Sequence, residues 1–331
     1  MSVSELYRSA HDRLGAVVEA RKEKKVYPAL GYASNLDLLC DFRTSTLNAL
    51  MAQYHPNLTQ AGLKVPGRIE SLEDLLVTIA YFCVNGIGGE AEIADGALFE
   101  EYFACTPGIG GTGVQAAKAL AAIGCPSIVH LTDDSKEVCN LLDSPFIYAV
   151  SGDGELVRTG RVQPTQEQEP HYIVQFQKGD VVELGSERIP IPASNRLIVT
   201  KVTVNDTLPL WEPYFAYIEE HAPSITSNVL SSFNCIVDAE LLAERLEYVT
   251  AHVKRYKASN PRGIVFFEEA HYHSQAIRKM CAETLYPFVD IMSLNEEELQ
   301  SLLSVYGFPK QAGGILDRID GAKFIRDTFG I

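Results

Sequence analysis

The segment from residue 263 to residue 299 alternates between short apolar runs and one amphipathic stretch, and this pattern constrains the fold most. The apolar runs cover residues 263–267 and 288–292, and residues 273–286 between them have helical periodicity. Two short apolar runs separated by an amphipathic helix predict a β-α-β unit with parallel strands. The chain is therefore predicted to fold as an α/β protein.

Acidic residues follow each apolar run. Glu268 comes directly after the first run, and residues 295–298 follow the second. Ligands bind at the carboxyl ends of parallel strands in open α/β sheets, and Glu268, Asn295 and Glu298 offer the oxygen ligands that suit Mg²⁺ bound together with substrate phosphates. This predicts phosphoryl transfer. An alternative is purely structural, with Asn295 capping a helix whose acidic first turn is favoured by the helix dipole.

The charge and cysteine content exclude several classes of protein. The 28 Lys and Arg residues and 43 Asp and Glu residues give a net charge of −15, which disfavours binding to nucleic acid or to anionic membranes. No apolar run is long enough to span a membrane, and residues 1–25 lack a signal-peptide core. Seven scattered cysteines without a Cys-x-x-Cys pair are expected to be reduced and mostly buried. We expect a cytosolic protein.

The rest of the chain divides into an alternating part and a β-rich part. Helices are predicted at 4–21, 71–83, 96–104, 112–123, 210–221 and 239–257, and strands at 26–32, 127–131 and 229–236. Between residues 145 and 203 the pattern changes to short β-like runs at 146–150, 172–176, 181–184 and 197–202. This change indicates a β-rich insertion or subdomain.

Four polar residues outside the acidic segments are candidates for ligand binding. Asn35 and Asp37 follow the strand predicted at 26–32, where they form either an Asx turn or a grip on vicinal sugar hydroxyls. His171 heads an apolar strand, where a structural histidine is the alternative to a functional one. Arg196 stands between a proline-rich turn and a strand. A solvated charge at the edge of the strand is the alternative to a functional role for this residue.

The run Gly108-Ile-Gly-Gly-Thr-Gly113 has the spacing of a dinucleotide-binding motif but the wrong predicted context. Residues 100–107 read as a helix followed by a proline turn, and the chain has no Gly-Lys-Ser/Thr sequence, so neither a Rossmann nor a phosphate-loop motif is supported. The remaining interpretations are a helix N-terminus that binds a hydroxyl or a phosphate and a tight entry into the helix.

Seven segments, taken in order, resemble the successive blocks of the ADP-dependent glucokinase and phosphofructokinase family, within the ribokinase-like superfamily. The segments are Gly31-Tyr-Ala-Ser-Asn-Leu-Asp37, Gly110-Gly-Thr-Gly-Val-Gln-Ala-Ala117, Pro170-His-Tyr-Ile-Val-Gln-Phe176, Ile191-Pro-Ala-Ser-Asn-Arg-Leu-Ile198, Leu230-Ser-Ser-Phe-Asn-Cys-Ile236, Phe266-Phe-Glu-Glu-Ala270 and Ser293-Leu-Asn-Glu-Glu-Glu298. Their order and spacing make the resemblance specific.

The resemblance implies an architecture and an activity. It implies a Rossmann-like, ribokinase-type large domain with three α/β/α layers (residues 1–34, 110–170 and 204–331) and a smaller β-rich lid domain (35–109 and 171–203), with the sugar between them. The implied activity is that of a glycolytic phosphotransferase with an alcohol group as acceptor. It would transfer a phosphoryl group from ADP to a hexose or hexose phosphate with Mg²⁺.

The resemblance also implies roles for individual residues. It implies sugar contacts at Asn35, Asp37, Gly110, Gly111 and His171, a catalytic phosphate contact at Arg196, and magnesium organised by Glu268, Asn295 and Glu298. Glu92 would correspond to the glutamate that glucose-type members use on a sugar hydroxyl, which favours an unphosphorylated hexose.

The sequence departs from the family pattern in three places. Phe266 replaces the usual histidine two residues before the metal-associated glutamate, and Ala193 replaces a basic residue. Family members also continue past the position of Ile331 with much of the adenine pocket and a Gly-x-Gly-Asp loop whose aspartate is the general base. We therefore expect this chain to lack the base, with the missing segment truncated, separately encoded or lost. Gly152-Asp153-Gly154 reads instead as a hairpin turn.

Two rival functions stay open at this point. One is a catalytically inactive sugar-binding or regulatory protein that retains the hydroxyl-binding residues. The other is an ATP-dependent enzyme of the ribokinase-like superfamily.

Overall fold

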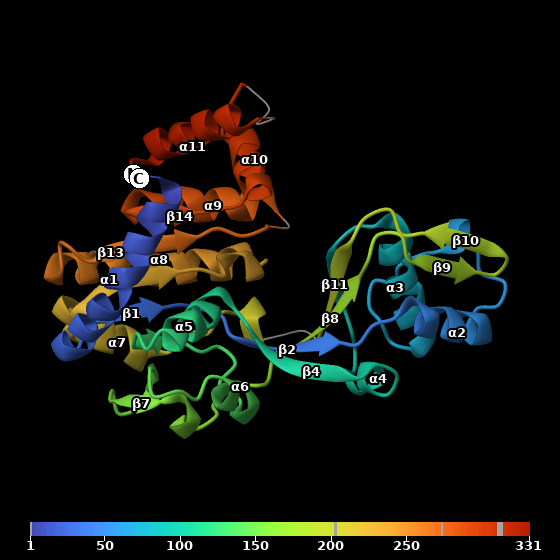
Figure 1. Cartoon of the computed structure of the whole chain (residues 1–331), viewed down its shortest axis with the longest axis horizontal. Coiled ribbons are helices and arrows are strands. Elements are labelled where there is room, and N and C mark those ends of the chain that lie inside the picture. Colours follow the sequence, from blue (N-terminus) through green and yellow to red (C-terminus); the bar gives the residue numbers. More distant parts are fainter. Residues whose placement is uncertain (1, 202–203, 273, 310–313) are drawn as a thin grey trace. The chain divides into compact units, whose positions relative to one another are not determined.

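The computed structural model describes residues 2–201, 204–272, 274–309 and 314–331 (Figure 1). The chain forms two compact units. The large unit contains residues 1–34, 110–167 and 204–331, and the small unit contains residues 35–109 and 168–203. Each unit has its own hydrophobic core.

The large unit is built on a seven-stranded sheet with the order β14-β13-β12-β1-β5-β6-β7. The strands are β1 (Tyr27–Leu30), β5 (Ser127–Val129), β6 (Ile147–Val150), β7 (Leu156–Arg158), β12 (Ile225–Leu230), β13 (Ile264–Glu268) and β14 (Ile291–Ser293). Neighbouring strands are parallel except β6 and β7, which are antiparallel. The result is a mostly parallel sheet of the predicted α/β class.

Helices pack on both faces of this sheet and give three α/β/α layers. The helices are α1 (Val3–Lys24), α5 (Thr112–Ala122), α6 (Lys136–Leu141), α7 (Glu212–Glu220), α8 (Ala239–Ser259), α9 (Gln275–Leu285), α10 (Glu296–Val305) and α11 (Ile315–Phe329). Short 3₁₀ helices lie at η2 (Thr159–Arg161), η3 (Val204–Asp206), η4 (Ala222–Ser224), η5 (Phe233–Cys235) and η6 (Tyr286–Phe288).

Helix α8 illustrates how the sequence specifies the large core. The Asp238 side chain accepts a hydrogen bond from the Leu241 backbone N–H and caps the helix. Leu242, Leu246 and Val253 then recur at helical spacing and are buried against the sheet. The β-α-β unit is confirmed in the same way, because α9 connects the parallel strands β13 and β14. His273, within the predicted helix, lies outside the described residues.

The small unit contains a five-stranded sheet with the order β3-β11-β8-β2-β4 and a separate hairpin. The sheet strands are β2 (Asn35–Cys40), β3 (Gly89–Glu92), β4 (Cys105–Gly110), β8 (Pro170–Phe176) and β11 (Asn195–Thr200), and the hairpin strands are β9 (Val181–Leu184) and β10 (Glu187–Pro190). The helices are η1 (Gln60–Gly62), α2 (Thr44–Tyr54), α3 (Leu72–Asn85) and α4 (Ala97–Glu100).

One face of the small sheet forms the core of the small unit. Tyr172, Val174 and Phe176 alternate along β8 and are buried together with Leu197 and Val199 of β11. Because successive side chains of a strand point to opposite faces, the residues between them lie on the other face of the sheet.

Three predictions differ from the structure. The run at 146–150, predicted as part of the β-rich insertion, is β6 of the large sheet. The helix predicted at 96–104 is limited to α4, because the chain turns after it and enters β4 at Cys105. The strand predicted at 229–236 is β12, which begins at Ile225 and ends at Leu230. The start of this strand was not predicted because Asn228 is polar and interrupts the apolar run. In the structure Asn228 is fully buried in the sheet and is hydrogen-bonded to His252.

The predicted states of the cysteines and of the surface charge can be compared with the structure. All seven cysteines are free, and Cys83, Cys125, Cys139 and Cys281 are buried, which confirms the prediction.

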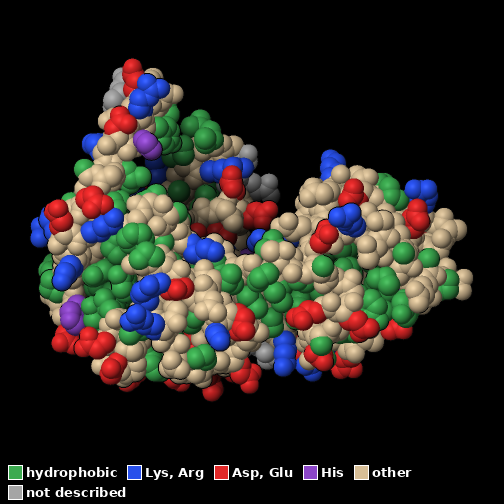
Figure 2. Space-filling view, turned by 60° about the horizontal axis from the view of Figure 1, so that its bottom comes forward, with side chains coloured by type: hydrophobic (Ala, Val, Ile, Leu, Met, Phe, Trp, Pro, Cys, Tyr) green, Lys and Arg blue, Asp and Glu red, His purple; other side chains and the backbone are tan. Residues whose placement is uncertain are grey.

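On the face shown in Figure 2, Lys and Arg side chains are interspersed with Asp and Glu side chains. Among the described helices, none is both long and apolar enough to cross a membrane.

Candidate functional site

Four polar residues of the small sheet lie in one row across neighbouring strands. Asp37 of β2 lies opposite His171 of β8. His171 lies opposite Thr200 of β11, and Thr200 lies opposite Glu92 of β3. Residues directly opposite one another share a face of the sheet, and this is the face that points away from the small core. The register therefore places three of the predicted sugar-binding residues in one row, with Asp37 next to His171 and with Thr200 between His171 and Glu92.

A hydrogen-bonded cluster occupies one end of this row. The Asn35 side-chain amide donates to Asp37 Oδ1 at 2.6 Å and lies 3.1 Å from His171 Nδ1. His171 Nε2 lies 3.0 Å from Oε1 of the buried Glu169. A neutral imidazole protonated at Nε2 satisfies both contacts, since the amide donates to Nδ1 and Nε2 donates to the carboxylate. Glu169 therefore fixes the ring, which sequence analysis did not foresee.

Asp37 keeps acceptor capacity in this cluster. Its Oδ2 accepts no hydrogen bond from the described residues, and its side chain is 20% exposed. Burial raises the pKa of Asp37, while His171, Arg196 and the hydrogen bond from Asn35 oppose that rise. Asp37 thus combines partial burial with an open oxygen, as a hydroxyl acceptor requires.

The location of Asn35 and Asp37 corrects the sequence prediction. They were expected in a polar turn, but both lie in strand β2. The reason is the alternation with Leu36 and Leu38, which lie on the opposite face of the strand. The polar residues are therefore held by the sheet and not by a turn.

Arg196 and Glu92 lie on the same face as the cluster but are differently engaged. Arg196 is the second residue of β11 and is exposed, and its charge acts to lower the pKa of Asp37. The Glu92 carboxylate pairs with Arg68, with 3.0 Å between Oε1 and Nε. Glu92 is two strands away from His171, which corresponds to about 10 Å.

Gly110 and Gly111 connect β4 to α5. Gly110 ends the strand and Gly111 is the N-cap residue of the helix, so a strand does precede the helix and the predicted helix-and-turn context was wrong. β4 nevertheless belongs to the five-stranded sheet and not to the parallel sheet, so no β-α-β motif forms here. Gly111 has φ +101°, and a Cβ there would collide with the backbone oxygen of Ala33.

The predicted metal ligands follow two neighbouring strands of the large sheet. Glu268 ends β13 and pairs with Ser293, the last residue of β14. Asn295 caps α10 through Oδ1, which accepts from the backbone N–H groups of Glu297 and Glu298 at 2.9 Å each. Glu298 Oε2 in turn accepts from the Asn295 backbone N–H at 2.7 Å. The predicted capping of an acidic first turn by Asn295 is confirmed, and Asn295 and Glu298 together form a capping box.

The two carboxylates are close enough to influence each other. Burial raises the pKa of Glu298, and the negative charge of Glu268 raises it further. Capping occupies Asn295 Oδ1 and Glu298 Oε2 and leaves the second oxygen of Glu298 outside the capping box. Two carboxylates fit the donor set of a magnesium ion that takes its remaining ligands from water and phosphate. Within the described residues, no group of three or more His, Cys, Asp or Glu side chains could hold a metal.

A buried arginine joins the segments that carry these carboxylates. Arg278 of α9 donates to the backbone oxygen of Ala270 at 2.7 Å and to that of Glu298 at 3.2 Å. Its Nε lies 3.6 Å from Glu269 Oε1, which also accepts from the Tyr286 hydroxyl at 2.8 Å. Sequence analysis missed this arrangement. The available signal was a charged residue on the apolar stripe of α9, between Ile277 and Cys281.

The hairpin prediction for residues 152–154 is confirmed. These residues connect the antiparallel strands β6 and β7, and Gly154 has φ +84°. The Asp153 carboxylate accepts from the Ser151 hydroxyl, and this bond lowers the pKa of Asp153. Asp153 is thus engaged in the turn itself.

The conserved region of ADP-specific phosphofructokinases and glucokinases matches residues 27–328 of the chain. The chain belongs to this family. The ADP-specific phosphofructokinase of Pyrococcus furiosus is 22% identical over 331 residues, which cover 92% of this chain and 70% of the relative. That of Thermococcus zilligii is 21% identical over 340 residues, covering 95% and 72%. The resemblance inferred from the seven sequence segments is confirmed.

Solved structures support the fold of this ADP-dependent kinase family member. A phosphofructokinase from Pyrococcus horikoshii with AMP has a TM-score of 0.72 at 19% identity, covering 92% of this chain and 72% of that one. An ADP-dependent kinase in complex with fructose 6-phosphate and ADPβS has a TM-score of 0.71 at 20% identity, covering 100% and 71%. Adenosine kinase from Trypanosoma brucei brucei reaches 0.51 at 11% identity, covering 92% and 74%. The ribokinase-like fold is confirmed.

Proposed function

We propose that this chain takes part in transferring a phosphoryl group from ADP to a hydroxyl group of a hexose or hexose phosphate. The observation that carries the proposal is the cluster of Asn35, Asp37 and His171, held in one orientation by the buried Glu169. An amide, a carboxylate and an imidazole offer both donors and acceptors to neighbouring hydroxyl groups. Membership of a family of sugar kinases supports this assignment.

The other predicted residues are assigned complementary roles. Gly110 and Gly111 lead into the N-terminus of α5, where backbone N–H groups favour a hydroxyl or an anion. The exposed guanidinium of Arg196 is suited to a phosphate group. Glu268 and Glu298 would hold Mg²⁺, which neutralises charge on the nucleotide phosphates when bound. These residues position the reactants, which is the main requirement of phosphoryl transfer.

The identity of the acceptor depends on two opposing observations. Glu92 lies in the same sheet row as Asp37 and His171, which favours a hydroxyl of an unphosphorylated hexose. Arg68 already pairs with Glu92, however, and both curated relatives described above are named phosphofructokinases. We propose fructose 6-phosphate as the second candidate acceptor. A direct competition between glucose and fructose 6-phosphate decides between them.

Calorimetric titration of the chain with each sugar tests the proposed site. The Asp37→Ala variant should lose sugar binding by at least roughly tenfold, because a hydrogen bond to a charged group contributes about 1.5–3 kcal/mol. Asp41→Ala is the matched control, since Asp41 lies just past the end of the same strand and is 65% exposed. Unchanged affinity in Asp37→Ala would remove Asp37 from the site.

An assay of phosphorylation with ADP, run on the same preparations, separates the kinase from its rival. Sugar binding that depends on Asp37, together with product formation from ADP, supports the proposed reaction. Asp37-dependent binding without product formation from either ADP or ATP would favour the inactive sugar-binding or regulatory protein. Turnover with ATP but not with ADP would favour the ATP-dependent alternative.

A further inference from the structure

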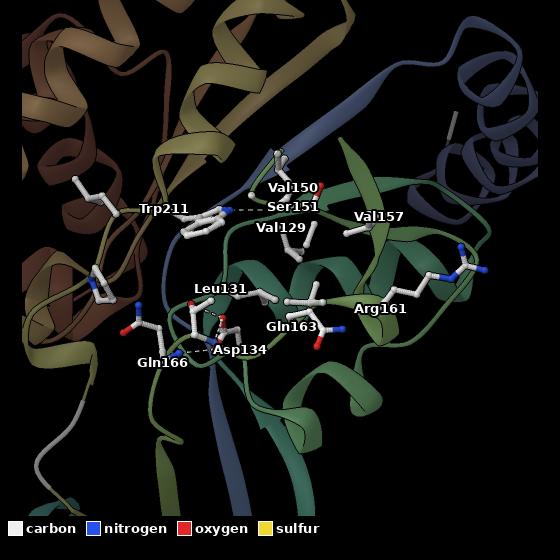
Figure 3. A pocket seen from close by; sticks show the side chains of 16 residues that line it. Val129, Leu131, Asp134, Val150, Ser151, Val157, Arg161, Gln163, Gln166 and Trp211 are labelled. Carbon is white, nitrogen blue, oxygen red and sulfur yellow. Dashed lines mark hydrogen bonds between the residues drawn. The ribbon is translucent and has the colours of Figure 1, made fainter. Parts of the chain in front are cut away.

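A cavity of about 300 Å³ lies in the large unit at the carboxyl ends of β5 and β6 (Figure 3). Its wall is mostly apolar and includes Val129, Ala149, Val150, Val157 and Trp211. None of the residues assigned to the sugar or to magnesium lines it. Small-molecule sites in open α/β folds occur at this end of the strands, so the cavity requires a separate explanation.

Hydrogen bonds fix the aromatic wall of the cavity. The Trp211 indole N–H donates to the backbone oxygen of Val150 at 2.8 Å, and the Trp211 backbone N–H donates to His130 Nε2 at 3.0 Å. His130 is buried, and its Nδ1 lies 3.0 Å from the backbone oxygen of Tyr32, so this nitrogen carries the proton. The indole is therefore held in one orientation, with Trp211 at one side of the cavity (Figure 3).

A second part of the wall is held by Asp134. Its carboxylate accepts hydrogen bonds from the backbone N–H groups of Thr165 and Gln166 and from the Thr165 hydroxyl, at 2.7–2.9 Å. Asp134 is buried, and these three donors offset its charge. The segment that closes the cavity is thus part of the fold, and the cavity is formed in advance of any ligand.

The remaining polar groups of the wall point to an anionic ligand. Arg161 is exposed at the rim of the cavity, where its side chain extends away from Trp211 (Figure 3), and its guanidinium makes no hydrogen bond or ion pair with the described residues. The side-chain amides of Gln163 and Gln166 likewise have no partner among the described residues. The cavity therefore combines an apolar interior containing an indole with a free cation and two amides.

We propose that this cavity binds a small molecule with a flat aromatic ring and one anionic group. The ring would lie against Trp211 and the valine side chains, because aromatic rings gain from contact with an indole and with apolar surface. The anionic group would pair with Arg161, whose guanidinium matches a carboxylate or phosphate. The site is independent of the sugar and nucleotide assignments.

Titration with 2-naphthoate, and with its neutral analogue 2-naphthamide, tests this proposal. Trp211 is the only tryptophan of the chain, so its fluorescence reports directly on the cavity. Naphthoate should quench this fluorescence and bind roughly tenfold or more tightly than naphthamide, as expected for a charged hydrogen bond. Calorimetry should give the same affinities.

Two variants and one control decide the outcome. Arg161→Gln should abolish the preference for naphthoate, and Val157→Phe should weaken both ligands by filling the cavity. Arg188→Gln, which changes an exposed arginine of the small unit, should retain the preference. The proposal is overturned if naphthoate fails to bind at about 1 mM. It is also overturned if both ligands bind Arg161→Gln and Val157→Phe as they bind the parent chain.

Discussion

The guanidinium of Arg278 donates a hydrogen bond to the backbone oxygen of Glu298, although 20 residues separate them in the sequence. The same guanidinium reaches the backbone oxygen of Ala270, two residues after Glu268. One buried side chain therefore links the segment after β13, which carries Glu268 at its end, to the first turn of α10, which carries Glu298. Glu269 and Tyr286 complete the buried cluster.

Arg278→Met should destabilise the large unit by about 3–5 kcal/mol, because it leaves the Glu269 carboxylate buried without its cation. The free energy of unfolding in urea measures this loss. Lys279→Met, at the neighbouring exposed position, should change stability by well under 1 kcal/mol. Adding Glu269→Gln to Arg278→Met should restore part of the stability. Equal stability of Arg278→Met and Lys279→Met would contradict the assigned role.

Glu268→Gln and Glu298→Gln should each raise the Mg²⁺ concentration needed for nucleotide binding, because each removes one of two charged oxygen ligands. Glutamine at position 298 retains the capping box, so α10 should remain folded, as circular dichroism would verify. The control is Glu297→Gln. Glu297 lies in the same helical turn but makes no contact with Glu268 in the described structure. A magnesium titration that is identical in all three variants would exclude the proposed metal site.

The stability of the chain should fall in acid because of His130. Burial lowers the pKa of His130 to about 4, against an ordinary value of 6.5. As the pH falls below 6.5, the unfolded chain takes up this proton before the folded chain does. The contribution of neutral His130 to the free energy of unfolding is therefore fully present above pH 6.5. It is lost progressively down to pH 4, and the total loss is about 3 kcal/mol.

His130→Gln provides the check on this pH dependence. Glutamine can still donate to the Tyr32 backbone oxygen and accept from the Trp211 N–H, but it does not titrate. Unfolding in urea between pH 7 and pH 4 should show a flatter profile for His130→Gln than for the parent chain. His11→Gln, at an exposed position of α1, should follow the parent profile. Parallel profiles for the parent and His130→Gln would refute the assignment.

Gly111→Ala should destabilise the junction between β4 and α5. A non-glycine residue in such a backbone conformation costs about 1–3 kcal/mol, and the added Cβ would also collide with the Ala33 backbone oxygen. Gly154→Ala separates the two effects, because Gly154 also has a positive φ but its Cβ would meet no atom within 4 Å. The thermal midpoint of Gly111→Ala should therefore lie below that of Gly154→Ala, and the reverse order would count against the close packing.

The sequence by itself determined the elements whose apolar residues recur at a fixed local spacing. Helices α5 and α8 and the β13-α9-β14 unit follow from such spacing, because a stripe three or four residues apart has to be buried on one side. The capping of α10 by Asn295 is equally local. The ordered segments between residues 31 and 298 also sufficed to indicate the family.

Only the tertiary structure decided which distant residues meet. Strands β2, β3, β8 and β11 are separated by long stretches of sequence, and their register alone aligns Asp37 with His171 and Glu92. The partners of Arg278 likewise come from two distant segments, the residues that follow β13 and the first turn of α10. Strand pairing and the burial of a charge depend on contacts far apart in the chain, for which local spacing carries no signal.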